Sequence, residues 1–104
     1  MDEMQSTVVR AYAKVDEVYA VLLGASDCQA RATALHAWRV QHVDDLAKIT
    51  SDIKRYPLDQ LKPVILAEAN NHKDAAAAIA MARECYADAA FMAEWKAIYD
   101  LFGG

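Results

Sequence analysis

Apolar residues recur at helical spacing at the start of the 104-residue chain. The first stripe contains Met4, Val8, Ala11, Val15, Val18 and Leu22. Its steps alternate between four and three residues, which is typical of an amphipathic helix that packs in a bundle. The pattern predicts a helix from about Asp2 to Leu23, with Gly24 as a left-handed cap.

A second helix is predicted to begin at the sequence Ser26-Asp27-Cys28-Gln29. This is a capping box in which the Ser26 hydroxyl accepts a hydrogen bond from a free backbone N–H and Gln29 reaches back. The helix should continue to about Arg55, because Pro57 disfavours helical geometry at Tyr56. Its main stripe contains Cys28, Leu35, Trp38, His42, Leu46, Ile49, Ile53 and Tyr56.

The same helix carries a second apolar strip, formed by Val40, Val43 and Ala47, with His36 beside it. At about 100° per residue this strip lies well away from the main stripe. A single core needs only one stripe. The helix is therefore either central in the domain or half of a self-association surface.

The segment after Pro57 predicts further helices with a changing apolar face. A third helix begins at Pro57 or at Pro63, since proline suits the first helical position. Its stripe contains Leu61, Ile65, Glu68, His72, Ala75, Ala76 and Ile79. Past residue 85 the large residues become Phe91, Trp95, Ile98 and Phe102, on a rotated line. A break is expected at Asn70-Asn71 or, as the favoured alternative, between Ala80 and Asp88.

Together these segments predict an all-α fold, an antiparallel bundle of four helices, with three as the alternative, in one domain spanning residues 1–104. Only 3 glycines and 2 prolines occur, too few for a β-sandwich or barrel. The net charge of -4, without a basic run, argues against nucleic-acid and membrane-surface partners. The longest apolar runs are about 8 residues, short of the roughly 20 that a membrane helix needs.

Cys28 and Cys85 are too far apart in sequence for a CxxC zinc or redox motif. We expect two reduced, buried thiols in a cytoplasmic protein, with a disulfide or a reactive thiol as the alternative. No positively charged region precedes an apolar core at the start, so no secretory signal is predicted. A shift of 57 residues aligns Cys28 with Cys85 and Trp38 with Trp95. That match is either a coincidence or the trace of two stacked hairpins.

Two histidines and a glutamate occupy apolar stripes. His42 and His72 lie at equal distances on either side of Pro57, so an antiparallel hairpin would bring them to the same height. Glu68, one turn before His72, shares its helix face. Imidazole and carboxylate ligands suit Zn²⁺, Fe or Mn²⁺.

Two more carboxylates, Asp45 and Glu94, could join such a metal site. The alternative is that Glu68 and His72 form a buried polar pair, either permanently satisfied or switched by protonation near neutral pH. Asp16 and Glu17 lie away from the stripe of their helix and are predicted to be solvated.

The segment from Val15 to Ile53 resembles the first hairpin of small ferritin-like bundles. It has an acidic pair followed by Tyr19, a short Ala-Ser-Asp turn, and then His36 and His42. The family uses Glu-x-x-His motifs, whereas the nearest pattern here is Glu68-x-x-x-His72. The resemblance therefore implies a helical bundle whose metal site is lost or altered.

The sequence favours a non-catalytic role, protein–protein association as a homodimer or by docking to a partner. No serine has histidine and aspartate partners at a recognisable spacing and no glycine-rich loop occurs, so no enzyme activity or cofactor is predicted. The expected interface residues are His36, Val40, Val43, Met92 and Tyr99, the last two lying beyond the edge of the C-terminal stripe. The alternative is a ferritin-like bundle that binds Zn or Fe through His42, His72 and Glu68.

Overall fold

The computed structural model describes residues 2–72 and 75–102 and is all-helical over them, which confirms the predicted fold class. Its five helices are α1 (Glu3–Gly24), α2 (Cys28–Ile53), α3 (Leu58–Ala69), α4 (Ala75–Glu84) and α5 (Ala89–Leu101). Across the described residues no helix is long and apolar enough to cross a membrane.

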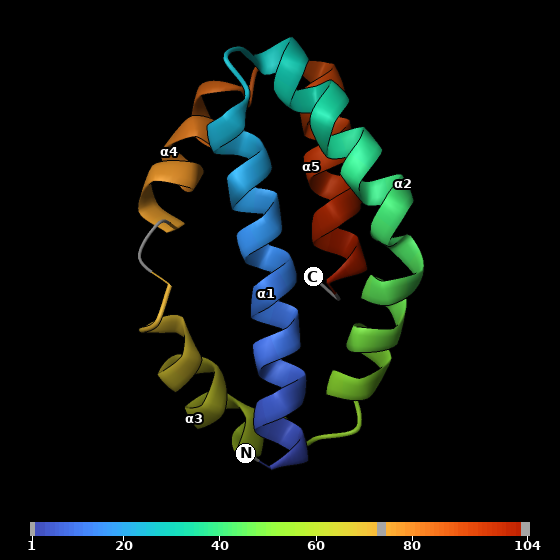
Figure 1. Ribbon diagram of the computed structural model, residues 1–104, viewed down its shortest axis with the longest axis vertical. Helices are drawn as coiled ribbons and strands as arrows, with labels where there is room; N and C mark the ends of the chain where they lie inside the picture. The colour runs from blue at the N-terminus through green and yellow to red at the C-terminus, as the bar shows by residue number, and fades with distance from the viewer. Residues whose placement is uncertain (1, 73–74, 103–104) are drawn as a thin grey trace.

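Helix α1 lies at the centre of the molecule (Figure 1). It packs against α2 on one side and against α3 and α4 on the other, and α5 packs against α2. The chain runs up through α1, down through α2, up through α3 and α4, and down again through α5, so α2 and α5 point in the same direction. The helices that flank Pro57 therefore do not form a packed hairpin, because α1 separates them (Figure 1).

Side-chain caps fix where the helices begin. Asp2 accepts from the backbone N–H of Gln5 at 2.8 Å, and the Gln5 side chain accepts from the Asp2 N–H, which completes a capping box. Asp27, not Ser26, caps α2 by accepting from Ala30 at 2.7 Å. Gly24 is the last residue of α1 and has no left-handed backbone, so its predicted role as a cap was wrong.

The predicted third helix is divided, which gives five helices where four were expected. Pro57 precedes α3 and Pro63 lies inside it. Breaks occur at both predicted positions, after Ala69 and between α4 and α5. Asp88 then caps α5 by accepting from the N–H of Phe91. Each piece is free to rotate and bury its own apolar face, which a single straight helix could not do.

The core forms where the predicted stripes meet. Leu22, Leu35, Leu46 and Phe91 are fully buried. Other buried apolar residues are Val8, Val18, Ala32, Trp38, Ile49, Leu61, Ala78, Ala82 and Ile98. In α4 the buried residues are Ala78 and Ala82, and not Ala75, Ala76 and Ile79 of the predicted stripe. Their small side chains let the backbone of α4 lie close to its neighbour.

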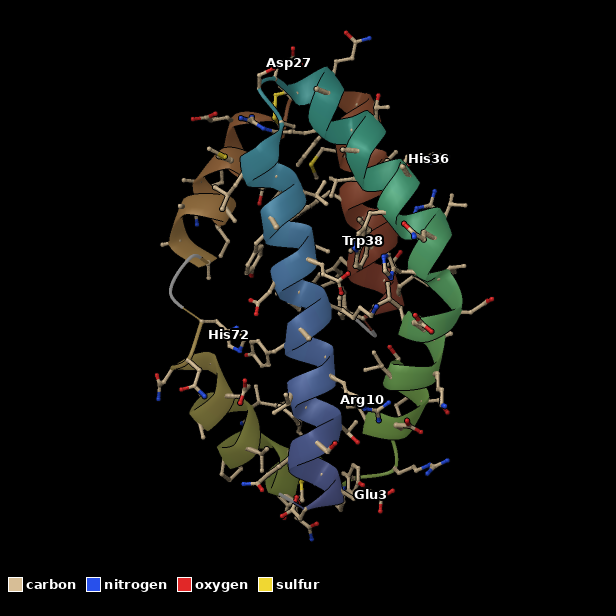
Figure 2. All side chains as sticks on the ribbon, viewed as in Figure 1. Glu3, Arg10, Asp27, His36, Trp38 and His72 are labelled. Atoms are coloured by element: carbon tan, nitrogen blue, oxygen red, sulfur yellow. A yellow bond between two sulfur atoms is a disulfide. The ribbon has the colours of Figure 1, made fainter. Side chains whose placement is uncertain are left out.

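Cys28 and Cys85 form a disulfide with a Cα–Cα distance of 5.4 Å. The prediction of two reduced thiols was therefore wrong. Cys28 begins α2 and Cys85 follows α4, and the two points meet at one end of the molecule, near Asp27 in Figure 2. The expected cytoplasmic location loses the support of reduced thiols, since disulfides persist mainly in oxidising compartments.

Truncating a core leucine should separate packing from surface effects. We expect Leu46→Ala to lower the free energy of unfolding by about 2–5 kcal/mol, through lost burial and the cavity left behind. The matched variant Leu66→Ala, at a position 65% exposed, should change it by less than about 0.5 kcal/mol. Urea unfolding of the oxidised proteins measures both. Equal effects at the two sites would contradict the described core.

Candidate functional site

The structure places His42 between α2 and α1. Its Nδ1 lies 3.0 Å from Nζ of Lys14, and its Nε2 lies 3.7 Å from Oε1 of Glu17. The ring stacks on Trp38 with a centroid distance of 4.6 Å. A lysine ammonium can only donate, so Nδ1 accepts its hydrogen bond. His42 thus completes a polar contact between the two helices.

His72 lies beyond the end of α3 and binds two carboxylates (Figure 2). Its Nδ1 is 2.7 Å from Oδ2 of Asp16, and its Nε2 is 2.9 Å from Oε1 of Glu68. The ring also stacks on Tyr12, with a centroid distance of 4.7 Å. Asp16 is exposed to solvent, as its position predicted, but it is also a partner of His72.

Both ring nitrogens of His72 face carboxylates, which can only accept when they are ionised, so both nitrogens donate in the imidazolium form. The hydrogen bond to Glu68 is the main reason that the pKa of His72 is raised above 6.5, and the bond to Asp16 adds to it. The raised pKa favours the imidazolium form of His72, and an imidazolium has no free lone pair that could bind a metal. The predicted Glu68–His72 polar pair is thus present, extended by a carboxylate of α1.

The predicted metal ligands are not brought together. The partners of His42 on α1, Lys14 and Glu17, lie roughly 160° and 100° around the helix from Asp16, the partner of His72. Among residues 2–72 and 75–102, no group of three or more His, Cys, Asp or Glu side chains could hold a metal ion. The prediction of a Zn or Fe site gains no geometric support from these residues.

The two additional carboxylates also have other partners. Asp45 lies 3.6 Å from Lys14. Glu94 of α5 accepts from Nε of Arg39 at 2.8 Å and lies 2.7 Å from Nδ1 of His36. The hydrogen bond from Arg39 is the main cause that lowers the pKa of Glu94. Glu94, Arg39 and His36 thus connect α2 to α5, and this contact is the role of His36 in the structure.

An apolar cleft separates α5 from α1. It has a volume of about 220 Å³ and is lined by Val15, Val18, Tyr19, Trp95, Ile98, Tyr99 and Phe102. Phe91 stacks beneath it on Trp95, with ring centroids 5.7 Å apart. Large aromatic side chains span the distance between the two helices but leave the cleft open.

A shallow hollow adjoins this cleft on the outer face of α5. It is lined by Ala89, Met92, Ala93, Trp95, Lys96 and Tyr99. Trp95 and Tyr99 border both depressions. We call the surface formed by Ala89, Met92, Ala93, Trp95 and Tyr99 the α5 aromatic face.

The residues expected at an interface fall into two groups. Tyr99 is 62% exposed and Met92 is partly buried, both on the α5 aromatic face. Val40 and Val43 are exposed on the outer strip of α2, beside His36. Sequence reasoning thus located two exposed apolar surfaces, but it did not predict the cleft beside one of them.

Two functional features escaped sequence reasoning. One is the role of Asp16, although its position on the face of α1 that carries Tyr12 and Tyr19 was an available signal. The other is the contact of the buried Arg31 with Cys85, because these residues are 54 positions apart and no local pattern relates them, whereas the disulfide itself was an alternative that the sequence left open.

No family model matches the chain, and neither a curated protein nor a solved structure matches it significantly. The ferritin-like resemblance therefore stays a prediction from residues 15–53.

The charge on His72 can be tested by titration. We expect the imidazole to titrate above pH 6.5 and Glu68→Gln to lower its pKa more than Asp16→Asn, because the Glu68 hydrogen bond is the largest cause of the shift. NMR of the ring protons follows each variant across the pH range. A wild-type pKa at or below 6.5, or no response to either variant, would contradict the described contacts.

The same contacts predict how stability depends on pH. The pKa of His72 is higher in the folded chain than the value of about 6.5 expected in the unfolded chain. The contribution of His72 to the free energy of unfolding is therefore fully present below pH 6.5 and is lost as the pH rises through the pKa of His72 in the folded chain. Urea unfolding is measured at pH 6 and again at a pH above the pKa of His72 in the folded chain. Between these two pH values, the free energy of unfolding should fall more for wild type than for His72→Gln. An equal loss in the two proteins would show that His72 contributes nothing.

Proposed function

We propose that the protein acts by self-association, as a homodimer that pairs two copies of the α5 aromatic face. The observation that carries this proposal is the exposure of Tyr99 beside an apolar cleft that residues 2–72 and 75–102 leave open. The proposed role is binding and assembly without catalysis.

Exposed aromatic side chains next to a cleft favour an interface. Tyrosine and tryptophan supply much of the binding energy at protein interfaces, and they do so in pockets from which water is excluded. Tyr99 and the half-buried Trp95 present such groups to solvent. Covering them would remove apolar surface from water at little cost in side-chain order, since each has only two side-chain torsions.

The face is also self-complementary. Tyr99 protrudes, whereas Ala89 and Ala93 on the preceding turns have small side chains and line the shallow hollow. In an antiparallel pair of α5 helices related by a two-fold axis, Tyr99 of each copy falls over Ala89 and Ala93 of the other. Lys96 also lines the hollow, so its stem would pack within the interface while its ammonium extends to water.

The α2 strip is a weaker choice for the same role. Val40 and Val43 are exposed, but neither lines any of the described depressions. Their short, stiff side chains offer no protruding group and no receiving cleft. The strip therefore serves as the control surface in the test of the proposal.

Sedimentation velocity over a range of concentrations tests the association. The wild-type chain should dimerise, Tyr99→Ala should weaken the dimer at least tenfold, and Ala93→Arg should block the receiving hollow. Val40→Asp should leave the dimer unchanged. A wild-type chain that stays monomeric, or a dimer lost in Val40→Asp but kept in Tyr99→Ala, would overturn the proposal.

A further inference from the structure

A buried arginine lies against the disulfide. Arg31, in the first turn of α2, is only 6% exposed, and its Nη1 is 3.2 Å from Sγ of Cys85. The carboxylate of Glu84 lies 3.6 Å from the same nitrogen, but the Glu84 side chain is 69% exposed. Within the part of the chain that the structure describes, the buried Nε of Arg31 has no hydrogen-bond partner.

While the disulfide is intact, the guanidinium of Arg31 lacks a strong anionic partner. A buried cation is costly unless a charge and full hydrogen bonding compensate it. A disulfide sulfur is neutral and a weak acceptor, and Glu84 is too exposed to offset burial. The sulfur of a Cys85 thiolate at the same position would carry a full negative charge next to Nη1 and would pair with the charge of Arg31.

We propose that Cys28–Cys85 is a reversible thiol–disulfide exchange site, in which Arg31 stabilises Cys85 as the leaving thiolate and a low-molecular-weight monothiol is the reductant. The proposal is independent of self-association through the α5 aromatic face, because it uses other residues and a different readout.

The exposure of the two sulfurs sets the order of the steps. Cys28 is partly exposed at the start of α2, whereas Cys85 is 1% exposed. An incoming thiolate attacks Sγ of Cys28 and forms a mixed disulfide there. The bond between the protein sulfurs breaks, and its electron pair leaves with Cys85 as a thiolate beside Arg31.

A second monothiol completes the exchange. Its thiolate attacks the outer sulfur of the mixed disulfide, forms the small-molecule disulfide and releases Cys28, which takes up a proton. Overall, two monothiols are oxidised to one disulfide and the protein disulfide is reduced. One proton is released to solvent, because Cys85 remains a thiolate. Oxidation of the protein is the same sequence in reverse.

The equilibrium with glutathione tests the role of Arg31. The oxidised full chain is incubated anaerobically at fixed pH in buffers with different ratios of reduced to oxidised glutathione, and free thiols are trapped by alkylation and counted by mass spectrometry. We expect Arg31→Gln to raise the ratio [GSH]²/[GSSG] needed for half reduction at least tenfold, which corresponds to about 30 mV. Arg31→Lys keeps the charge and should restore much of the difference.

A change at Glu84 gives a prediction of opposite sign that does not depend on refolding a buried site. Glu84→Gln removes the anion that competes for Arg31 and repels a Cys85 thiolate, so half reduction should need a lower ratio than in wild type. In Cys85→Ser, glutathione should be trapped on Cys28.

Three results would overturn the inference. Arg31→Gln and Glu84→Gln could both stay within twofold of wild type, which would make Arg31 a packing residue only. Both variants could shift in the same direction, which the charge argument forbids. Glutathione could also be found on Cys85 and not on Cys28 when each cysteine is replaced in turn.

Discussion

The structure depends on one packing constraint: α1 must bury two sides at once. Its central stripe of Val8, Val18 and Leu22 is covered by neighbouring helices. On one flank, Tyr12 stacks on His72 beyond the end of α3, and Tyr19 lines the cleft toward α5. Because both pairs of helices need this one helix, the chain between α2 and α3 passes around the end of α1 and does not fold back on α2 (Figure 1). The disulfide joins the two sides of the molecule at the opposite end.

The position of α1 also explains the chemistry of the three histidines. His42 and His72 approach α1 from different sides, and each meets charges that α1 presents there. The third, His36, shares Glu94 with Arg39 at the contact of α2 with α5. Each imidazole is thus committed to joining two elements. A buried or half-buried polar group needs such a partner whether or not it has a further role.

Sequence periodicity was sufficient for the helices and for most of the core, because the stripes around Leu22, Leu46 and Phe91 reflect burial directly. It could not reveal which helices pair, since the stripe of α1 is compatible with neighbours on either flank. The predicted hairpin at Pro57 failed for that reason, and the convergence of His42 with His72 depended on it. The contacts of Asp16 with His72 and of Arg31 with Cys85 escaped because each joins residues more than fifty positions apart in the sequence.

The features that packing leaves unexplained are the ones that carry the proposals. A fold that needed α5 only for its core would use Phe91, Ile98 and the partly buried Trp95 and could place a polar residue at Tyr99, which is 62% exposed. Likewise, a disulfide that served only as a brace would pack well against an apolar neighbour, whereas this one faces a buried cation with too few partners. Exposed apolar surface and a poorly paired buried cation each cost free energy. In the two proposals, a second copy of the chain removes the first cost and two-electron reduction of the disulfide lowers the second.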